Sequence, residues 1–163
     1  MNRYRYTDGY RSADLLQAAT DHLSAAKTLF NDEHVEHLDS AGYLAHLGVE
    51  LILKAMLLNK TKEFPETHSL QGLLGQVVTN FPAASLRGKD SPYRDILIAL
   101  DRFYDLRYPS PTVSPGISRG DWDAIKLLVE RLRGAMPLEL REEFDLRGQV
   151  NKSGRVVVSY DRR

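Results

Sequence analysis

Apolar residues recur at intervals of three and four positions along most of the chain, a spacing that places side chains on one face of an α-helix. Such stretches extend over Ser12–Asn31, Leu38–Leu58, Thr67–Val78, Ser91–Tyr104 and Ser118–Leu132. Prolines and glycines separate the later stretches and interrupt helical structure there. The pattern predicts an all-α fold, an antiparallel up-and-down bundle of four to five helices.

The second stretch is apolar on nearly every side, with leucines, an isoleucine and a methionine along its length. A helix of this kind is covered on most sides, so we expect it to be the central element of the bundle. Its polar exceptions are His46, Glu50 and Lys54, which stand four residues apart. They therefore line up in one row along the helix.

The sequence divides into an N-terminal arm over residues 1–11, rich in Arg and Tyr, a helical domain over residues 12–146 and a tail over residues 147–163. A further short helix is expected over Pro137–Phe144. Within the tail, Gly154–Tyr160 contains three consecutive valines and predicts a short strand without an evident pairing partner in the chain.

Positive and negative residues balance in this chain, with 22 Lys and Arg against 22 Asp and Glu. Proteins that coat nucleic acid without sequence preference depend on a positive excess, so the balance argues against that class. Neutrality also removes long-range repulsion between copies, which favours self-association. The 163 residues suffice for one domain with one core.

The chain has no cysteine, which excludes disulfides, thiolate metal sites and a cysteine nucleophile, and which suits a reducing cytoplasm. The first residues, MNRYRY, lack the apolar run of a signal peptide. The most apolar stretch, Val49–Leu58, is interrupted by Glu50 and Lys54 and is too short to span a bilayer. We therefore expect a cytoplasmic protein with no membrane association.

Glu50 and Lys54 form the first candidate for a ligand-binding site, because they stand one helical turn apart in the favourable order. One interpretation is an ordinary ion pair on the solvent-exposed edge of the helix. The other is that Glu50 is partly buried and pairs with Arg107 from the fourth helix, since a carboxylate removed from water needs such a partner.

His68 is the first candidate for catalysis, and Arg107 is the second. His68 stands at the start of the third helix, where its role can be to fix the loop by hydrogen bonding to the backbone near the second helix. Alternatively, it is a general acid or base that titrates near neutral pH. That role needs a second group close by, for which Arg107 is the best candidate.

Arg102, Tyr104, Arg107 and Tyr108 bring cations and aromatic rings together around the end of the fourth helix. Bases stack on Tyr while Arg holds phosphate, so this group is a candidate contact for a nucleotide or RNA. The alternative is that Tyr104 packs in the core and Arg102 reaches solvent.

The segment His34–His37 has two histidines three residues apart, flanked by acidic residues, and two such imidazoles reach one metal when the segment is helical. The pattern of a zinc-protease helix, with histidines four apart and a Glu after the first, is absent. We interpret the segment as a solvated acidic turn. There is also no glycine-rich phosphate loop, so we predict neither a metal site nor a cofactor.

Three segments resemble a known family. Ala41–Leu57, with the sequence AGYLAHLGVELILKAML, is similar to the "A…E…LKALL" core helix of HEPN domains. Phe64–Leu70 resembles the "P-x-T-H-x-L" segment that follows it, and Asp105–Pro109 resembles the "RYP" ending of the fourth helix in members that pair with minimal nucleotidyltransferases. The segments occur in the family's order, and the resemblance covers residues 12–135.

The resemblance implies a compact antiparallel helical bundle, often dimeric, of prokaryotic type. Many HEPN members are RNA-cleaving toxins or effectors, and others are partners of a nucleotidyltransferase antitoxin. The ribonuclease members use an Arg followed four to six residues later by a His. Here no Arg lies between Arg11 and Arg87, and all five histidines fall between them, so no Arg precedes a His at that spacing.

We therefore expect a HEPN-like binding or regulatory module, a homodimer in a prokaryotic defence or toxin–antitoxin-like context. Its expected partners are a nucleotidyltransferase-type protein or a nucleotide or RNA ligand. One alternative is an RNA-cleaving enzyme with a non-standard site such as His68 with Arg107. Another is a structural or assembly domain whose strand at Val156–Val158 adds to the edge of a partner's sheet.

Overall fold

The computed structural model describes residues 2–82, 86, 93–107 and 116–152, and for residues 105–107 and 149–152 it describes the backbone alone. Tyr108, the start of the expected fourth helix at Ser91 and the expected C-terminal strand at Gly154–Tyr160 lie outside these residues. The assembly alternative, which depends on that strand, therefore stays a prediction.

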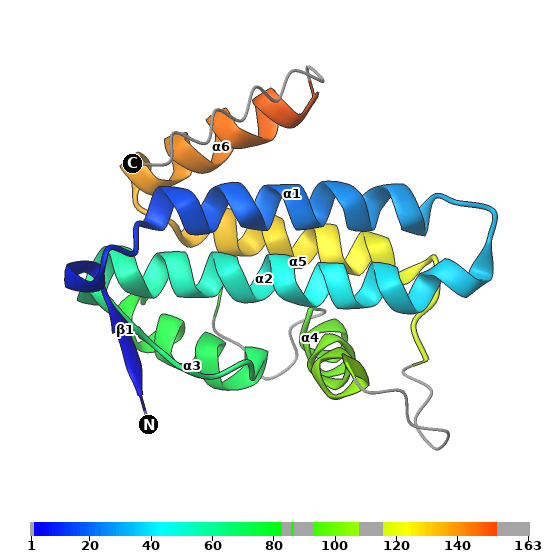
Figure 1. The fold of residues 1–163 in the computed structure, drawn as a ribbon, viewed down its shortest axis with the longest axis horizontal. Coiled ribbons are helices and arrows are strands. Elements are labelled where there is room, and N and C mark those ends of the chain that lie inside the picture. The colour runs from blue at the N-terminus through cyan, green and yellow to red at the C-terminus, as the bar shows by residue number, and fades with distance from the viewer. Residues whose placement is uncertain (1, 83–85, 87–92, 108–115, 153–163) are drawn as a thin grey trace.

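Three long helices form the body of the domain (Figure 1). α1 (Ser12–Phe30) and α2 (Leu38–Thr61) run antiparallel side by side, joined by a short turn, and α5 (Asp121–Ala135) lies behind them. α3 (Leu70–Asn80) and α4 (Arg94–Asp101) cover the other side of α2. α4 is seen almost along its axis, so it crosses the long helices steeply, and a 3₁₀ turn over Arg102–Arg107 follows it. The all-α prediction is confirmed.

The core is centred on α2, as its sequence predicted. Within the stretch Val49–Leu58 only Leu51 is partly exposed, and all the other side chains are buried. Phe30 of α1, Leu73 of α3, Leu100 of α4 and Leu128 of α5 are all fully buried or nearly so in the same core. Because these residues come from four helices that all contact α2, this helix is the shared element of the core.

The last helix is longer than the sequence pattern indicated. α6 (Leu138–Lys152) continues beyond Phe144 and beyond the expected domain end at residue 146. It is tied to the bundle by Arg133, whose guanidinium donates to Asp145 at 2.6 and 2.5 Å, and by Arg147, which reaches Gln17 of α1 at 3.2 Å. The apolar periodicity of α6 is weak, so charged hydrogen bonds, and not apolar packing alone, hold its later turns against the bundle.

The N-terminal segment is part of the folded domain. β1 (Arg3–Arg5) pairs antiparallel with β2 (Glu63–Pro65), and Tyr4 stands opposite Phe64. The rings of Tyr4, Tyr10 and Phe64 pack together, with centroids 5.1 to 5.5 Å apart. The residues expected to form an arm at 1–11 thus contribute a strand and an aromatic cluster.

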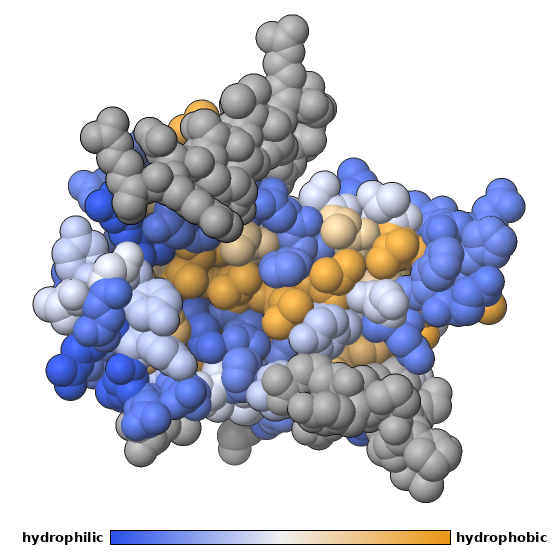
Figure 2. All heavy atoms as spheres, viewed as in Figure 1, coloured by the Kyte–Doolittle hydropathy of each residue, from blue (hydrophilic) through white to orange (hydrophobic). Residues whose placement is uncertain are grey.

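Half-buried leucines remain on the outer side of the bundle. Figure 2 shows apolar surface in a band along the layer that α1 and α2 form. Within α2, Leu44, Leu47 and Leu51 stand three and four residues apart, so they share one face of the helix, and they are only partly buried. We name these three residues the leucine row.

By length and composition, one helical stretch of the described residues, Val35–Thr61, is sufficient to cross a membrane. This stretch is longer than Val49–Leu58, the interval that the sequence analysis judged too short to span a bilayer. Of its most apolar window, 78% is buried inside the domain. The buried core helix of a folded bundle can also be long and apolar enough to meet this criterion.

Candidate functional site

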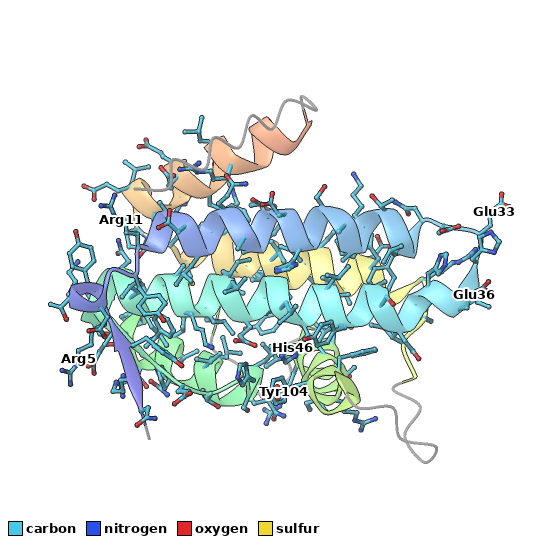
Figure 3. The ribbon with its side chains drawn as sticks, in the orientation of Figure 1. Arg5, Arg11, Glu33, Glu36, His46 and Tyr104 are labelled. Atoms are coloured by element: carbon cyan, nitrogen blue, oxygen red, sulfur yellow. The ribbon has the colours of Figure 1, made fainter. Side chains whose placement is uncertain are left out.

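The row of three polar residues in the middle of α2 is buried on the side of the helix that faces α3 and α4. His46, Glu50 and Lys54 have 0%, 4% and 6% of their surface exposed. Figure 3 shows His46 pointing away from α1 toward Tyr104 and α4. The interpretation of Glu50 and Lys54 as an exposed ion pair is therefore wrong. Their i, i+4 spacing specified a common face but not what covers it.

Glu50 is the centre of a buried charge cluster. Its Oε1 accepts a hydrogen bond from Lys54 Nζ at 2.6 Å, and both its oxygens lie 3.1 Å from His68 Nδ1. Burial by itself raises the pKa of Glu50, but the polar contacts from His46 and Lys54 and the charges of Lys54 and His68 outweigh it and lower the pKa to about 2. Glu50 is therefore ionised at neutral pH.

The proton position on His46 is set by the end of α4. Its Nδ1 lies 2.9 Å from the carbonyl oxygen of Leu100, which only accepts, so Nδ1 carries a hydrogen. Its Nε2 is 3.3 Å from Glu50 Oε2 but lies outside hydrogen-bonding alignment. The contact of Nε2 with this carboxylate is therefore a close approach of two polar atoms and not a hydrogen bond.

His68 connects this buried cluster to the surface. Its Nδ1 bonds to the side chain of Glu50, in contrast to the expected bond to backbone. Its ring stacks on Tyr104, with the centroids 4.2 Å apart and the planes 13° apart. The side chain is 39% exposed, so part of the imidazole is open to solvent. Two fixed contacts thus hold one orientation of the imidazole.

A surface cleft of about 610 Å³ opens beside His68, a volume within the range of small-molecule sites. It is lined by Glu66, Thr67, His68, Ser69, Gln71, Ile98, Asp101, Arg102 and Tyr104. These residues come from the segment before α3, from α3 itself, and from α4 with the 3₁₀ turn that follows it. The cleft therefore lies where the third and fourth helices meet.

Asp101, at the end of α4, is engaged within the protein. Its carboxylate accepts from the backbone N–H of Leu70 at 2.6 Å and of Gln71 at 3.3 Å, and from Ser69 Oγ at 3.3 Å. Ser69 also caps α3, because its Oγ accepts from Gly72 N at 3.2 Å. Asp101 therefore satisfies the positive N-terminal end of α3.

Of the predicted ligand-binding residues, Arg102 and Tyr104 line the cleft and His68 joins them. Glu50 and Lys54 lie behind His68 in the buried cluster. The side chain of Arg107 and all of Tyr108 lie outside the described residues, so the predicted pairs Glu50–Arg107 and His68–Arg107 stay predictions.

Sequence reasoning missed Glu66 and Asp101 in the cleft. Glu66 precedes the His68 segment directly, and this proximity was a usable signal. Asp101 acts on a helix that starts 31 residues earlier, and no local pattern indicates such a contact. His46 was noticed in the polar row but was given no partner, because the Leu100 carbonyl is 54 residues away.

The segment His34–His37 forms a short turn between α1 and α2. His37 Nδ1 lies 2.8 Å from Asp32, and His34 Nδ1 lies 3.4 Å from Glu36. Among the residues that the structure describes, no group of three or more His, Asp or Glu side chains is arranged to hold a metal ion.

The sequence was compared with protein families, curated proteins and solved structures. No curated protein and no solved structure matches it. The sequence profile of the HEPN domain matches residues 12–136, a region that contains α1 to α5 and every residue lining the cleft. Because this match covers most of the chain, the protein belongs to the HEPN domain family.

Proposed function

We propose that the protein is a HEPN binding or regulatory module of the prokaryotic cytoplasm and that its cleft binds a nucleotide, either free or as part of RNA. The observation that carries this proposal is the arrangement of His68, stacked on Tyr104 and anchored to Glu50, beside the exposed Arg102. Aromatic and imidazole faces stack with bases, and an Arg guanidinium pairs with phosphate.

Arg102 is suited to the phosphate because it makes no ion pair with any residue in the described part of the chain. Asp101 next to it is occupied by the start of α3. The guanidinium is therefore available to a ligand, and one charge-assisted hydrogen bond contributes on the order of 1.5–3 kcal/mol.

Calorimetric titration with AMP and with a short oligoadenylate tests the proposal. Arg102→Gln should weaken both ligands by about tenfold. Arg119→Gln is the matched control, since Arg119 is an exposed arginine just before α5 and outside the cleft. Absence of binding by the unchanged protein at millimolar ligand would refute the proposal, as would equal losses in the two variants.

A second candidate function, RNA cleavage, is favoured by the contact between Glu50 and His68. A carboxylate in contact with Nδ1 fixes the orientation of the imidazole and leaves Nε2 as the nitrogen that can exchange a proton with a substrate, the position required of a general base. Such a base accepts the proton of a ribose 2′-hydroxyl as that oxygen attacks the adjacent phosphate. The bond from phosphorus to the 5′-oxygen of the next nucleotide then breaks, which leaves a 2′,3′-cyclic phosphate, and the departing 5′-oxygen takes a proton from water. Cleavage of total RNA that His68→Ala leaves unchanged, or no cleavage at all, would dismiss this candidate.

We further propose that the protein is a homodimer and that it engages a nucleotidyltransferase-type partner. The leucine row supports the first part, because partly exposed leucines on a neutral protein favour association with a second copy. The second part is tested first by whether a neighbouring gene encodes a minimal nucleotidyltransferase and then by co-expression of the two proteins. Failure of the two proteins to co-purify would count against it.

A further inference from the structure

The carboxylate of Glu66 is held on the rim of the cleft by the N-terminal strand. Tyr4 Oη donates to Glu66 Oε1 at 3.0 Å, and the backbone N–H of Glu66 donates to the carbonyl of Asn2 at 2.9 Å. Hydrogen bonds from Asn2 and Tyr4 also lower the pKa of Glu66, so it is ionised at neutral pH. Both anchoring residues lie outside the region that matches the HEPN domain.

The strand that carries Tyr4 is itself fixed. Arg3 Nε pairs with Glu63 at 2.6 Å, Tyr6 N donates to the carbonyl of Lys62 at 2.9 Å, and the Tyr4 ring lies 5.4 Å from that of the buried Phe64. β2 leads directly into Glu66 and His68. The position of Glu66 in the cleft therefore depends on contacts that bridge about sixty residues of sequence.

The charges that remain available in the cleft limit what it can bind. Asp101 accepts four hydrogen bonds from the N-terminus of α3, whereas the exposed Glu66 accepts hydrogen bonds from Tyr4 and Asn2. Among the described lining residues, Glu66 therefore keeps more acceptor capacity for a ligand, and Arg102 supplies a cation. A carboxylate only accepts hydrogen bonds, so it requires a donor on the ligand. On a nucleotide, the ribose hydroxyls are donors that stand apart from the phosphate.

We propose that Glu66 is a specificity-determining residue that accepts a hydrogen bond from the ribose 2′-hydroxyl, so that the cleft prefers ribonucleotides to deoxyribonucleotides. This inference rests on the proposed function, because it assumes that a nucleotide occupies the cleft. The 2′-hydroxyl is the group by which proteins distinguish RNA from DNA. Tyr4 acts as a positioning residue, because it reaches the ligand only through Glu66.

Dissociation constants for AMP and for 2′-deoxyadenosine 5′-monophosphate, measured on the full chain, test the inference. The unchanged protein should bind AMP about tenfold more tightly, the factor expected from one charge-assisted hydrogen bond. Glu66→Ala should remove this preference by weakening AMP alone. Tyr4→Phe, which keeps the ring but loses the hydroxyl, should give an intermediate ratio.

Glu36→Ala is the matched control, since Glu36 is an exposed carboxylate in the turn between α1 and α2, at one end of the molecule and away from Tyr104 (Figure 3). Its AMP preference should equal that of the unchanged protein. Circular dichroism confirms that each variant is folded.

The outcomes separate this inference from the proposed function. If neither nucleotide binds, the nucleotide-binding proposal itself fails. If both bind equally, or if Glu66→Ala keeps the preference for AMP, the role of Glu66 is refuted while nucleotide binding stands. If Tyr4→Phe keeps the full preference while Glu66→Ala loses it, the N-terminal strand has no positioning role.

Discussion

Two sides of the same helix differ in a way that composition alone would not suggest. On the side facing α3 and α4, α2 buries the polar row of His46, Glu50 and Lys54. On its outer side, the leucine row is only partly buried. The usual order of burial is reversed, since charged residues are rarely buried unless they are paired. The polar residues of the buried row are stable in the interior because they interact with one another.

Each side of α2 has its own physical requirement. The buried row is acceptable because Glu50 faces Lys54 and two histidines, so the cluster is compensated internally. The leucine row has no such internal requirement and is free to meet another surface. We expect substitutions on the two sides to have effects of very different size and kind.

The largest effect is expected for Glu50→Ala, which leaves Lys54 buried without its carboxylate and removes the anchor of His68. Breaking one member of a buried charge cluster costs about 3–5 kcal/mol of the free energy of unfolding. Urea denaturation measures this value. Leu47→Ala on the outer side is the control, and it should lower the free energy of unfolding by less than about 1.5 kcal/mol. If the two variants lose equal stability, the two sides of α2 do not differ in this way.

The second largest effect is expected from acid, which should lower the free energy of unfolding by protonating Glu50. The folded-state pKa of Glu50 is about 2 and its ordinary value is 4.5, so its stabilisation is complete above pH 4.5 and is lost as the pH falls toward 2. The upper bound of this contribution is on the order of 3 kcal/mol. Denaturation between pH 2 and pH 6 measures the slope.

Glu50→Gln is the comparison for the acid experiment, because the amide does not titrate. Its unfolding free energy should depend less on pH across the same interval. A weaker dependence of stability on pH should remain in both proteins. It comes from Asp32 and Asp145, whose pKa values are lowered mainly by hydrogen bonds from His37 and Arg133 respectively. Parallel slopes for the two proteins would mean that Glu50 is not the titrating group.

The contact of α2 with α1 is expected to be sensitive to an added methyl group. A Cβ at Gly48 would stand 2.6 Å from Leu23 Cγ and 3.2 Å from the carbonyl oxygen of Ala19, which is backbone and cannot move aside cheaply. Gly48→Ala should therefore destabilise the domain by about 1–3 kcal/mol in thermal or urea unfolding.

Gly134→Ala provides the matched control for this prediction, because Gly134 also lies within a helix but has open space at its Cβ position. Removing the glycine from α5 should stabilise the domain by about 0.5–1 kcal/mol. A stabilising Gly48→Ala would show that α1 and α2 are less closely packed than described.

The smallest effect on folding, and a specific effect on association, is expected for Leu47→Lys. Leu47 is half-buried on the outer side, so a lysine there can extend into solvent with a cost within about 1 kcal/mol. A charge in an apolar contact between copies would oppose dimer formation. Sedimentation at micromolar concentration should therefore show a dimer for the unchanged protein and a monomer for the variant, and a monomer in both cases would end the dimer proposal.

The helices and the central place of α2 were predictable because apolar periodicity is a local property of the sequence. Leu38 was the predicted and the observed start of α2, and Ser12 was the predicted and observed start of α1. The chemistry of Glu50 was not predictable in the same way. Spacing aligned it with Lys54, but the contact with His68 depends on how the segment after β2 folds back across α2.

The cleft residues show the same limit more strongly. His68, Arg102 and Tyr104 were singled out for their chemical types, but their meeting depends on the packing of α3 against α4. The pairing of β1 with β2 joins positions about sixty residues apart through three residues on each strand. Strands this short carry no periodicity, so the sequence offered only an arginine- and tyrosine-rich segment.

The pairing of β1 with β2 has a practical consequence for anyone who purifies this protein. An affinity tag fused ahead of Asn2 would continue the chain directly beside the segment that leads to His68. Such a fusion would alter the measured affinity even when the bundle folds normally. A tag placed after the last residue, or one removed completely by a protease, is the safer choice for ligand assays.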